Sequence, residues 1–94
     1  MAVYAMVHVD VRDAEEYAKY AALAGPAVKK YGGEFLVRGG ATEVMEGTSR
    51  ARNVIIRFAD METAKSFYNG PEYQEALAYA LPVSDRDYLF VEGV

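Results

Sequence analysis

The chain has 94 residues and a mass of 10.4 kDa, which is enough for one domain and too little for two, because domains usually contain about 100–150 residues. Hydrophobic residues make up 52% and charged residues 26%, so the chain is expected to fold rather than remain disordered. The net charge of −4 disfavours nucleic acid or an anionic membrane as a partner, and the absence of cysteine excludes disulfides and thiolate metal sites.

Alternating and helical periodicities divide the chain into strands and helices. Asp13 stands three residues before Glu16, a capping-box spacing that predicts the start of a helix. Gly25-Pro26 lies inside this helix and predicts a kink or a break, because proline cannot donate a backbone hydrogen bond. The predicted elements, in chain order, are a strand at 2–10, a helix at about 13–31, a strand at 34–38, a bulge or bend at Gly39-Gly40 with a resumed strand pattern at 42–47, a strand at 52–59, two helical segments divided at Asn69-Gly70-Pro71 and a strand at 87–94.

This order predicts an α+β, ferredoxin-like β-α-β-β-α-β subunit, with a four-stranded antiparallel sheet in the order 4-1-3-2 and both helices on one face. Along the strands, the residues at alternate positions that belong to one face of the sheet are uniformly apolar, and this face is expected to contact the helices. The other set is also too apolar for water, so we expect a homodimer through this sheet face, with a monomer that exposes the face as the alternative. The predicted helix-facing set is Val3, Ala5, Val7, Phe35, Val37, Val54, Ile56, Phe58, Leu89 and Val91, and the opposite set is Tyr4, Met6, His8, Leu36, Arg38, Ile55, Arg57, Tyr88 and Phe90.

Strand directions bring four polar residues to one end of the sheet, where they are expected to share a face: His8, Arg38, Asn53 and Tyr88. Such a cluster is suited to a small anion or enol. His8 is the only histidine and therefore the candidate general acid or base. Arg38 is expected to bind a ligand carboxylate or to pair with a protein acid. Tyr88 and Tyr68 are candidate hydrogen-bond donors to an oxyanion, and Asn53 is a candidate substrate-binding residue.

Other kinds of site are not expected. One histidine and no cysteine provide no transition-metal site, and no phosphate-binding motif of the type GxGxxG or GxxxxGK[ST] is present, so no metal or bound cofactor is predicted. The run of charges at 85–87 predicts a solvated turn. No signal peptide or apolar stretch of about 18 residues is recognisable, and a cytoplasmic protein without membrane contact is expected.

Motifs along the whole chain resemble the DUF1330 family of the dimeric α/β-barrel superfamily, and the resemblance implies a single domain over residues 1–94. Dimers of such subunits form a barrel from two sheets, but the family brings no defined activity. The wider superfamily includes cofactor-independent monooxygenases, lactone isomerases, haem-binding enzymes and stress-responsive proteins. The motifs that carry the resemblance are VDVRDAEEYAKY, YGGEFLVRGG, EVMEG, NVIIRF, SFYNGPEYQ and VEG.

Hypotheses from different classes therefore remain open. In the first, the protein is a small enzyme that acts on an aromatic or enolisable anionic metabolite without a bound cofactor, with His8 as acid or base and Arg38 orienting the anion. In the second, it is a non-catalytic ligand-binding or stress-associated dimer. In the third, the four polar residues only satisfy one another across the dimer. The sequence also leaves open whether a pocket lies between the sheet and the helices or between two sheets.

Overall fold

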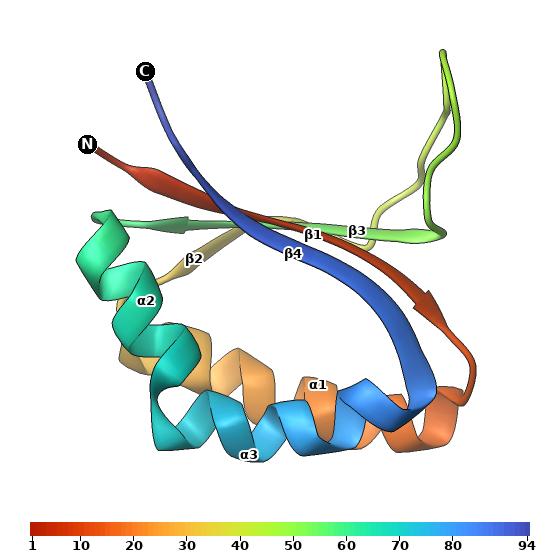
Figure 1. The fold of residues 1–94 in the computed structure, drawn as a ribbon, viewed down its shortest axis with the longest axis horizontal. Coiled ribbons are helices and arrows are strands. Elements are labelled where there is room, and N and C mark those ends of the chain that lie inside the picture. Colours follow the sequence, from red (N-terminus) through yellow and green to blue (C-terminus); the bar gives the residue numbers. More distant parts are fainter.

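The computed structural model describes residues 1–94 as one antiparallel sheet with all the helices on one face (Figure 1). The strand order is β2-β3-β1-β4, which confirms the predicted ferredoxin-like α+β fold. No helix has the length and apolar character needed to cross a membrane. In chain order the elements are β1 (Val3–Val11), α1 (Ala14–Lys30), β2 (Glu34–Arg38), β3 (Arg52–Phe58), α2 (Met61–Asn69), α3 (Pro71–Ala80), the 3-10 turn η1 (Leu81–Val83) and β4 (Ser84–Glu92).

Helix α1 begins as the sequence predicts. The Asp13 carboxylate accepts hydrogen bonds from the backbone N–H groups of Glu15 and Glu16, at 3.1 and 3.2 Å. The helix then runs without a break through Pro26, so of the predicted kink or break at Gly25-Pro26 the break does not occur. Pro26 and Ala22, the residue whose carbonyl loses its intrahelical donor, are both exposed, and water can therefore replace the missing hydrogen bond.

The core lies between the helix-facing side of the sheet and the three helices. In β1 every second residue from Val3 to Val9 is at most 3% exposed, which confirms the predicted side for this strand. The aromatic rings of Phe58, Phe67 and Tyr73 pack beneath this strand. The Phe67 ring centroid lies 5.1 Å from that of Phe58 and 4.7 Å from that of Tyr73. These rings fill the space between sheet and helices and fix the distance between the two layers.

Strand β4 faces the opposite way from the prediction. Its register places Tyr88 opposite Val7 and Phe90 opposite Ala5, and directly opposed residues of an antiparallel pair lie on the same face. Tyr88 and Phe90 therefore point toward the helices. Leu89 and Val91, 45% and 39% exposed, lie on the open face instead.

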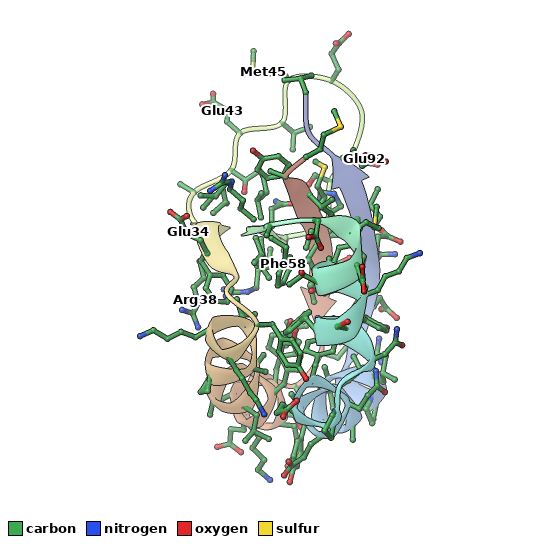
Figure 2. All side chains as sticks on the ribbon, turned by 90° about the vertical axis from the view of Figure 1, so that its left-hand side faces the viewer. Glu34, Arg38, Glu43, Met45, Phe58 and Glu92 are labelled. Atoms are coloured by element: carbon green, nitrogen blue, oxygen red, sulfur yellow. The ribbon has the colours of Figure 1, made fainter.

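A bulge reverses the end of β2. Phe35 pairs with Ile56, but the next pair joins Val37 to Ile55, so Leu36 is the extra residue. The predicted faces of Val37 and Arg38 are therefore both wrong: Val37 lies on the open face and Arg38 on the helix-facing side. Figure 2 shows Arg38 directed toward α1, while Glu34 at the start of β2 points away from the helices.

The predicted strand at 42–47 does not form, and residues 39–51 make a long loop between β2 and β3. The loop stands on the side of the sheet opposite to the helices (Figure 1). Met45 lies at its tip (Figure 2) and is 85% exposed. The Met45 side chain therefore makes little contact with the rest of its own subunit.

Candidate functional site

A cavity lies between the sheet and the helices. Twelve of its sixteen lining residues are hydrophobic, and its only charged residues are Arg38, Arg52 and Arg86. The cavity is small, with a volume of about 40 Å³, or room for about three water molecules. An apolar cavity with a few converging polar groups is the usual form of a small-molecule site.

The sheet register explains how the arginines converge. Arg52 on β3 and Arg86 on β4 are both direct partners of Val9, which is fully buried on the helix-facing side. Arg38 enters the same side from β2 because of the bulge, and its guanidinium lies over the Phe35 ring, 4.1 Å from the centroid. Arg38 is exposed and stands at the open end of the cavity, whereas Arg52 and Arg86 are half-buried.

Glycine makes room for the arginine at the β2 edge. Gly39 has a φ of +70°, and a Cβ atom there would lie 2.2 Å from Nη1 of Arg52. Only a residue without a side chain allows both the left-handed backbone and this position of the guanidinium. Gly25 on α1 similarly faces Arg38, whose Nη2 would be 3.1 Å from a Cβ at that position.

None of the three cavity arginines forms an ion pair. No carboxylate lies within 4.0 Å of Arg38, Arg52 or Arg86, and every ion pair of the structure involves other cations. Charges that leave water are normally paired, and like charges in a partly apolar cavity repel. The cavity therefore has an uncompensated positive potential and is suited to an anion.

Arg86 is held by phenols rather than by acids. Its Nη2 donates to the Tyr20 hydroxyl at 2.8 Å and its Nη1 to the Tyr73 hydroxyl at 3.3 Å. The two hydroxyls also contact each other at 3.0 Å, and the guanidinium lies 4.7 Å from the Tyr20 ring centroid. The predicted solvated turn at 85–87 is therefore wrong, because Arg86 is a β4 residue that points into the interior.

Burial keeps these phenols neutral. Desolvation raises the pKa of Tyr73 to about 12, and it raises the pKa values of Tyr20 and Tyr88 as well. All three hydroxyls are therefore protonated at physiological pH and can donate hydrogen bonds. The cavity thus combines fixed positive charges with neutral donors, an arrangement that stabilises negative charge on a ligand oxygen.

The four predicted cluster residues do lie at one end of the sheet, but on two faces. His8 pairs directly with Asn53 on the open face, whereas Arg38 and Tyr88 line the cavity on the helix-facing side. The structure therefore brings His8 together with Asn53, and Arg38 together with Tyr88. It does not bring His8 together with Arg38.

The polar residues at this end of the open face form hydrogen bonds and ion pairs with one another within one chain. Nδ1 of His8 lies 2.6 Å from Oδ1 of Asn53. Arg50 bridges the carboxylates of Asp10 and Asp87, at 3.0 and 2.8 Å. A hydrogen bond from the Ala51 N–H, together with Arg50, holds the pKa of Asp10 below its usual value. Asp10 is thus occupied by Arg50 and is not available as a partner for an arginine of the cavity.

Tyr68 does not line the cavity. Its ring packs in the aromatic cluster against Tyr73 and Tyr88, with centroids 5.2 and 5.5 Å apart. The polar cavity residues that were not candidates from the sequence are Arg52, Arg86, Tyr17, Tyr20 and Tyr73. No group of three or more histidine, cysteine or acidic side chains is placed to hold a metal ion.

The fold defines a ferredoxin-like α+β subunit, and similar solved structures share it. A protein of unknown function from Rhodopseudomonas palustris superposes with a TM-score of 0.79 at 19% identity, over 99% of this chain and 82% of that one. A dimeric ferredoxin-like protein of unknown function from Jannaschia gives 0.79 at 13% identity, over 99% and 100% of the chains. SnoaB, a cofactor-independent oxygenase from Streptomyces nogalater, gives 0.58 at 8% identity, over 99% and 93%.

The chain belongs to the DUF1330 family, a domain of unknown function whose model matches residues 2–94. The resemblance inferred from the sequence motifs is therefore confirmed. No curated protein sequence matches the chain. At the identities of the solved structures the similarity extends to the fold alone, and the chemistry of the site has to be argued from its own residues.

Proposed function

We propose that this protein binds a small organic anion, without a bound cofactor, in the cavity between the sheet and the helices. One observation carries the proposal: three arginines converge on a largely apolar cavity that contains no carboxylate. A small carboxylate with an apolar skeleton suits both properties, because the skeleton would contact the apolar lining and the charge would offset that of the guanidinium groups.

The residues of the cavity favour binding over covalent catalysis. Its lining includes no serine, threonine, cysteine, histidine or acid, so it offers no nucleophile with an adjacent base. His8, the candidate acid or base, lies on the open face and contacts Asn53. What the cavity does offer to a bound enol or carboxylate is stabilisation of negative charge by Arg86 and the phenols.

Benzoate is a suitable probe, and isothermal titration calorimetry measures its affinity for the purified protein. Arg52→Met is expected to weaken binding by about tenfold or more, because a hydrogen bond to a charged group contributes about 1.5–3 kcal/mol. Arg12→Met is the matched control, since Arg12 is exposed and pairs with Asp85 on the surface. If benzoate does not bind, or if both variants bind it as the wild type does, the proposal is wrong.

We also propose that the functional unit is a homodimer through the open sheet face. An apolar groove on this face is lined by Tyr4, Met6, Leu36, Val37, Ile55 and Val91, and exposed apolar patches of this kind mark interaction surfaces. The occupant is a second copy of the chain, as in the similar proteins described as dimeric. The projecting loop supports the same arrangement, because Met45 stands on that side of the sheet, where a second sheet would lie. Sedimentation should give a particle of twice 10.4 kDa.

The alternative of a purely structural polar cluster is supported for the open face alone. There His8 and Asn53 satisfy each other at 2.6 Å. His8→Ala is therefore expected to lower the melting temperature or the dimer affinity and to leave benzoate binding unchanged. A loss of benzoate affinity in this variant would instead place His8 in the binding machinery.

A further inference from the structure

The loop between β2 and β3 has apolar residues at its tip. Val44 and Met45 are 50% and 85% exposed, and the loop projects on the side of the sheet opposite to the helices (Figure 1). The sequence at 42–47 alternates as a strand does, yet the loop pairs with no strand of its own subunit. A segment with these properties is suited to contact with another chain.

Hydrogen bonds at its two ends attach the loop to the sheet. At its start, the Gly39 N–H donates to the Asn53 carbonyl at 2.9 Å, and the Asn53 amide donates to the Thr42 hydroxyl at 3.3 Å. At its end, the Ala51 N–H donates to the Asp10 carboxylate at 2.9 Å. Both ends are thus fixed, and the tip extends away from the sheet (Figure 2).

Two copies of the open face can stack in two ways. A twofold axis along the strands places both loops at the same end of the stacked sheets, and an axis across the strands places them at opposite ends. In the second arrangement, each loop reaches the end of the partner's sheet where β1 begins and β4 ends. Stacked sheets lie about 10 Å apart, and half of the loop, about six residues, spans more than this distance when extended.

The charges of the open face favour the second arrangement. The loop carries Glu43 and Glu46 beside its apolar tip. The end of the sheet from which the loop rises is acidic as well, and its Arg50 already bridges Asp10 and Asp87. Loops at the same end would therefore bring like charges together, which is unfavourable.

The opposite end of the open face is suited to the loop tip. Tyr4 lies at the centre of a row of residues there, with Arg57 as its direct partner on β3 and Val91 on β4. Tyr4 and Val91 line the apolar groove of this face. Arg57 is exposed, and its one ion pair, with Glu34 at 4.0 Å, is the longest of the structure. Its charge is therefore available to an acid of another chain.

We propose that the loop at 39–51 is a dimerisation arm, which crosses to a second copy of the chain and contacts the partner's Tyr4, the partner's Arg57 and the partner's Val91. Met45 packs against the apolar surface of this row, and the glutamates beside it face the guanidinium. This inference rests on the proposed homodimer. It adds which ends of the two sheets lie together and which segment joins them.

Cross-linking between introduced cysteines tests the arrangement, because the chain has no cysteine of its own. The double variant Met45→Cys/Val91→Cys, treated with a short bismaleimide, is expected to give a covalent dimer on a denaturing gel. Each single variant is expected to give monomers only, because the two equivalent cysteines lie at opposite ends of the dimer. Met45→Cys/Ala22→Cys is the matched control, since Ala22 is exposed on α1, away from the open face.

The outcomes separate the arm from the homodimer. A covalent dimer from either single variant would overturn the proposed arrangement. Absence of a covalent dimer from Met45→Cys/Val91→Cys, in a protein that sediments as a dimer, would overturn the arm and leave the homodimer intact. A monomeric wild type would overturn both.

A second measurement tests the tip without a cross-linker. Met45→Ser is expected to raise the dimer dissociation constant by about tenfold or more, because it removes an apolar side chain that the partner buries. Leu81→Ser is the matched control, since Leu81 is 59% exposed and lies beyond α3. Sedimentation velocity across a concentration series measures both variants. Equal association of the two would overturn the contact of Met45 with the partner.

Discussion

Arg52 and Arg86 lie on either side of Val9, each as its direct partner across an adjacent strand. Because opposed residues of antiparallel strands share a face, both guanidinium groups belong to the buried side of the sheet. No carboxylate accompanies them. A small domain has little stability to spare, so the anion that we propose as ligand would offset a costly pair of positive charges.

The position of Arg52 can be tested without changing an arginine. Gly39→Ala would place a Cβ 2.2 Å from Nη1 of Arg52, and we expect the displaced guanidinium to lower benzoate affinity by about tenfold. Gly47→Ala is the matched control, since Gly47 has a φ of +74° and no atom near its Cβ position. Both variants should lose about 1–2 kcal/mol of stability from the left-handed backbone. Equal benzoate affinities in the two variants would contradict this role for Gly39.

The fold was predictable because its signals are local. Asp13 caps α1 through its own side chain, and Gly70-Pro71 divides α2 from α3 as expected, with proline at the first turn. The alternation of β1 also identified its buried side, since small and β-branched residues alternate there with larger or polar ones. Each of these features depends on neighbours in the sequence, and a single chain contains that information.

The two faces of β4 were not predictable, because both parities are apolar. Tyr88 and Phe90 alternate with Leu89 and Val91, and composition does not distinguish the sides. The register with β1 decides, and it is a long-range property. Arg86 was misassigned for a related reason, since Asp85 and Asp87 on the open face hide the alternation that continues through it.

The side of Arg38 depended on a bulge that no glycine marks. The extra residue is Leu36, in the middle of the strand EFLVR, and the glycines that indicated a bend follow three and four residues later. One inserted residue moves every later side chain of the strand to the other face. The predicted cluster was therefore divided, with Arg38 in the cavity and His8 on the open face.

The proposed dimer makes a specific prediction for the open face. Leu89→Asp is expected to raise the dimer dissociation constant by about tenfold or more, because burial of a leucine side chain contributes about 2 kcal/mol. Leu81→Asp is the matched control: Leu81 is 59% exposed, against 45% for Leu89, but lies beyond α3, away from the open face. Sedimentation velocity across a concentration series measures both. Equal association of the two variants, or a monomeric wild type, would refute the interface.

The link between α1 and α3 should make stability fall in acid. Lys30 and the Tyr31 hydroxyl both donate to Glu72, and these hydrogen bonds lower the pKa of the Glu72 carboxyl from 4.5 to about 2. A carboxyl with a depressed pKa in the folded state stabilises the protein above its unfolded pKa. That contribution is lost as the pH falls from about 4.5 to about 2.

Glu72→Gln should therefore remove part of this pH dependence. We expect a lower urea midpoint than wild type at pH 7 and a smaller difference between the two proteins at pH 2.5. Glu75→Gln, an exposed position on the same helix with no ion pair, is the control. A difference between Glu72→Gln and wild type that stays constant from pH 7 to pH 2.5 would show that the ionised carboxylate is not the source of the stability.

The phenols around Arg86 should make stability fall in alkali as well. Tyr73 is 1% exposed, and desolvation raises its pKa from 10.0 to about 12. Between these values the unfolded chain releases the phenol proton before the folded chain does, so unfolding becomes more favourable as the pH rises above 10. Tyr73→Phe is expected to lower stability at pH 8, because Arg86 and Tyr20 lose a partner, and to flatten the decline above pH 10. Urea unfolding from pH 8 to 11 measures both effects, with Tyr79→Phe as the exposed control. A slope in Tyr73→Phe as steep as in wild type would mean that other groups cause the alkaline loss.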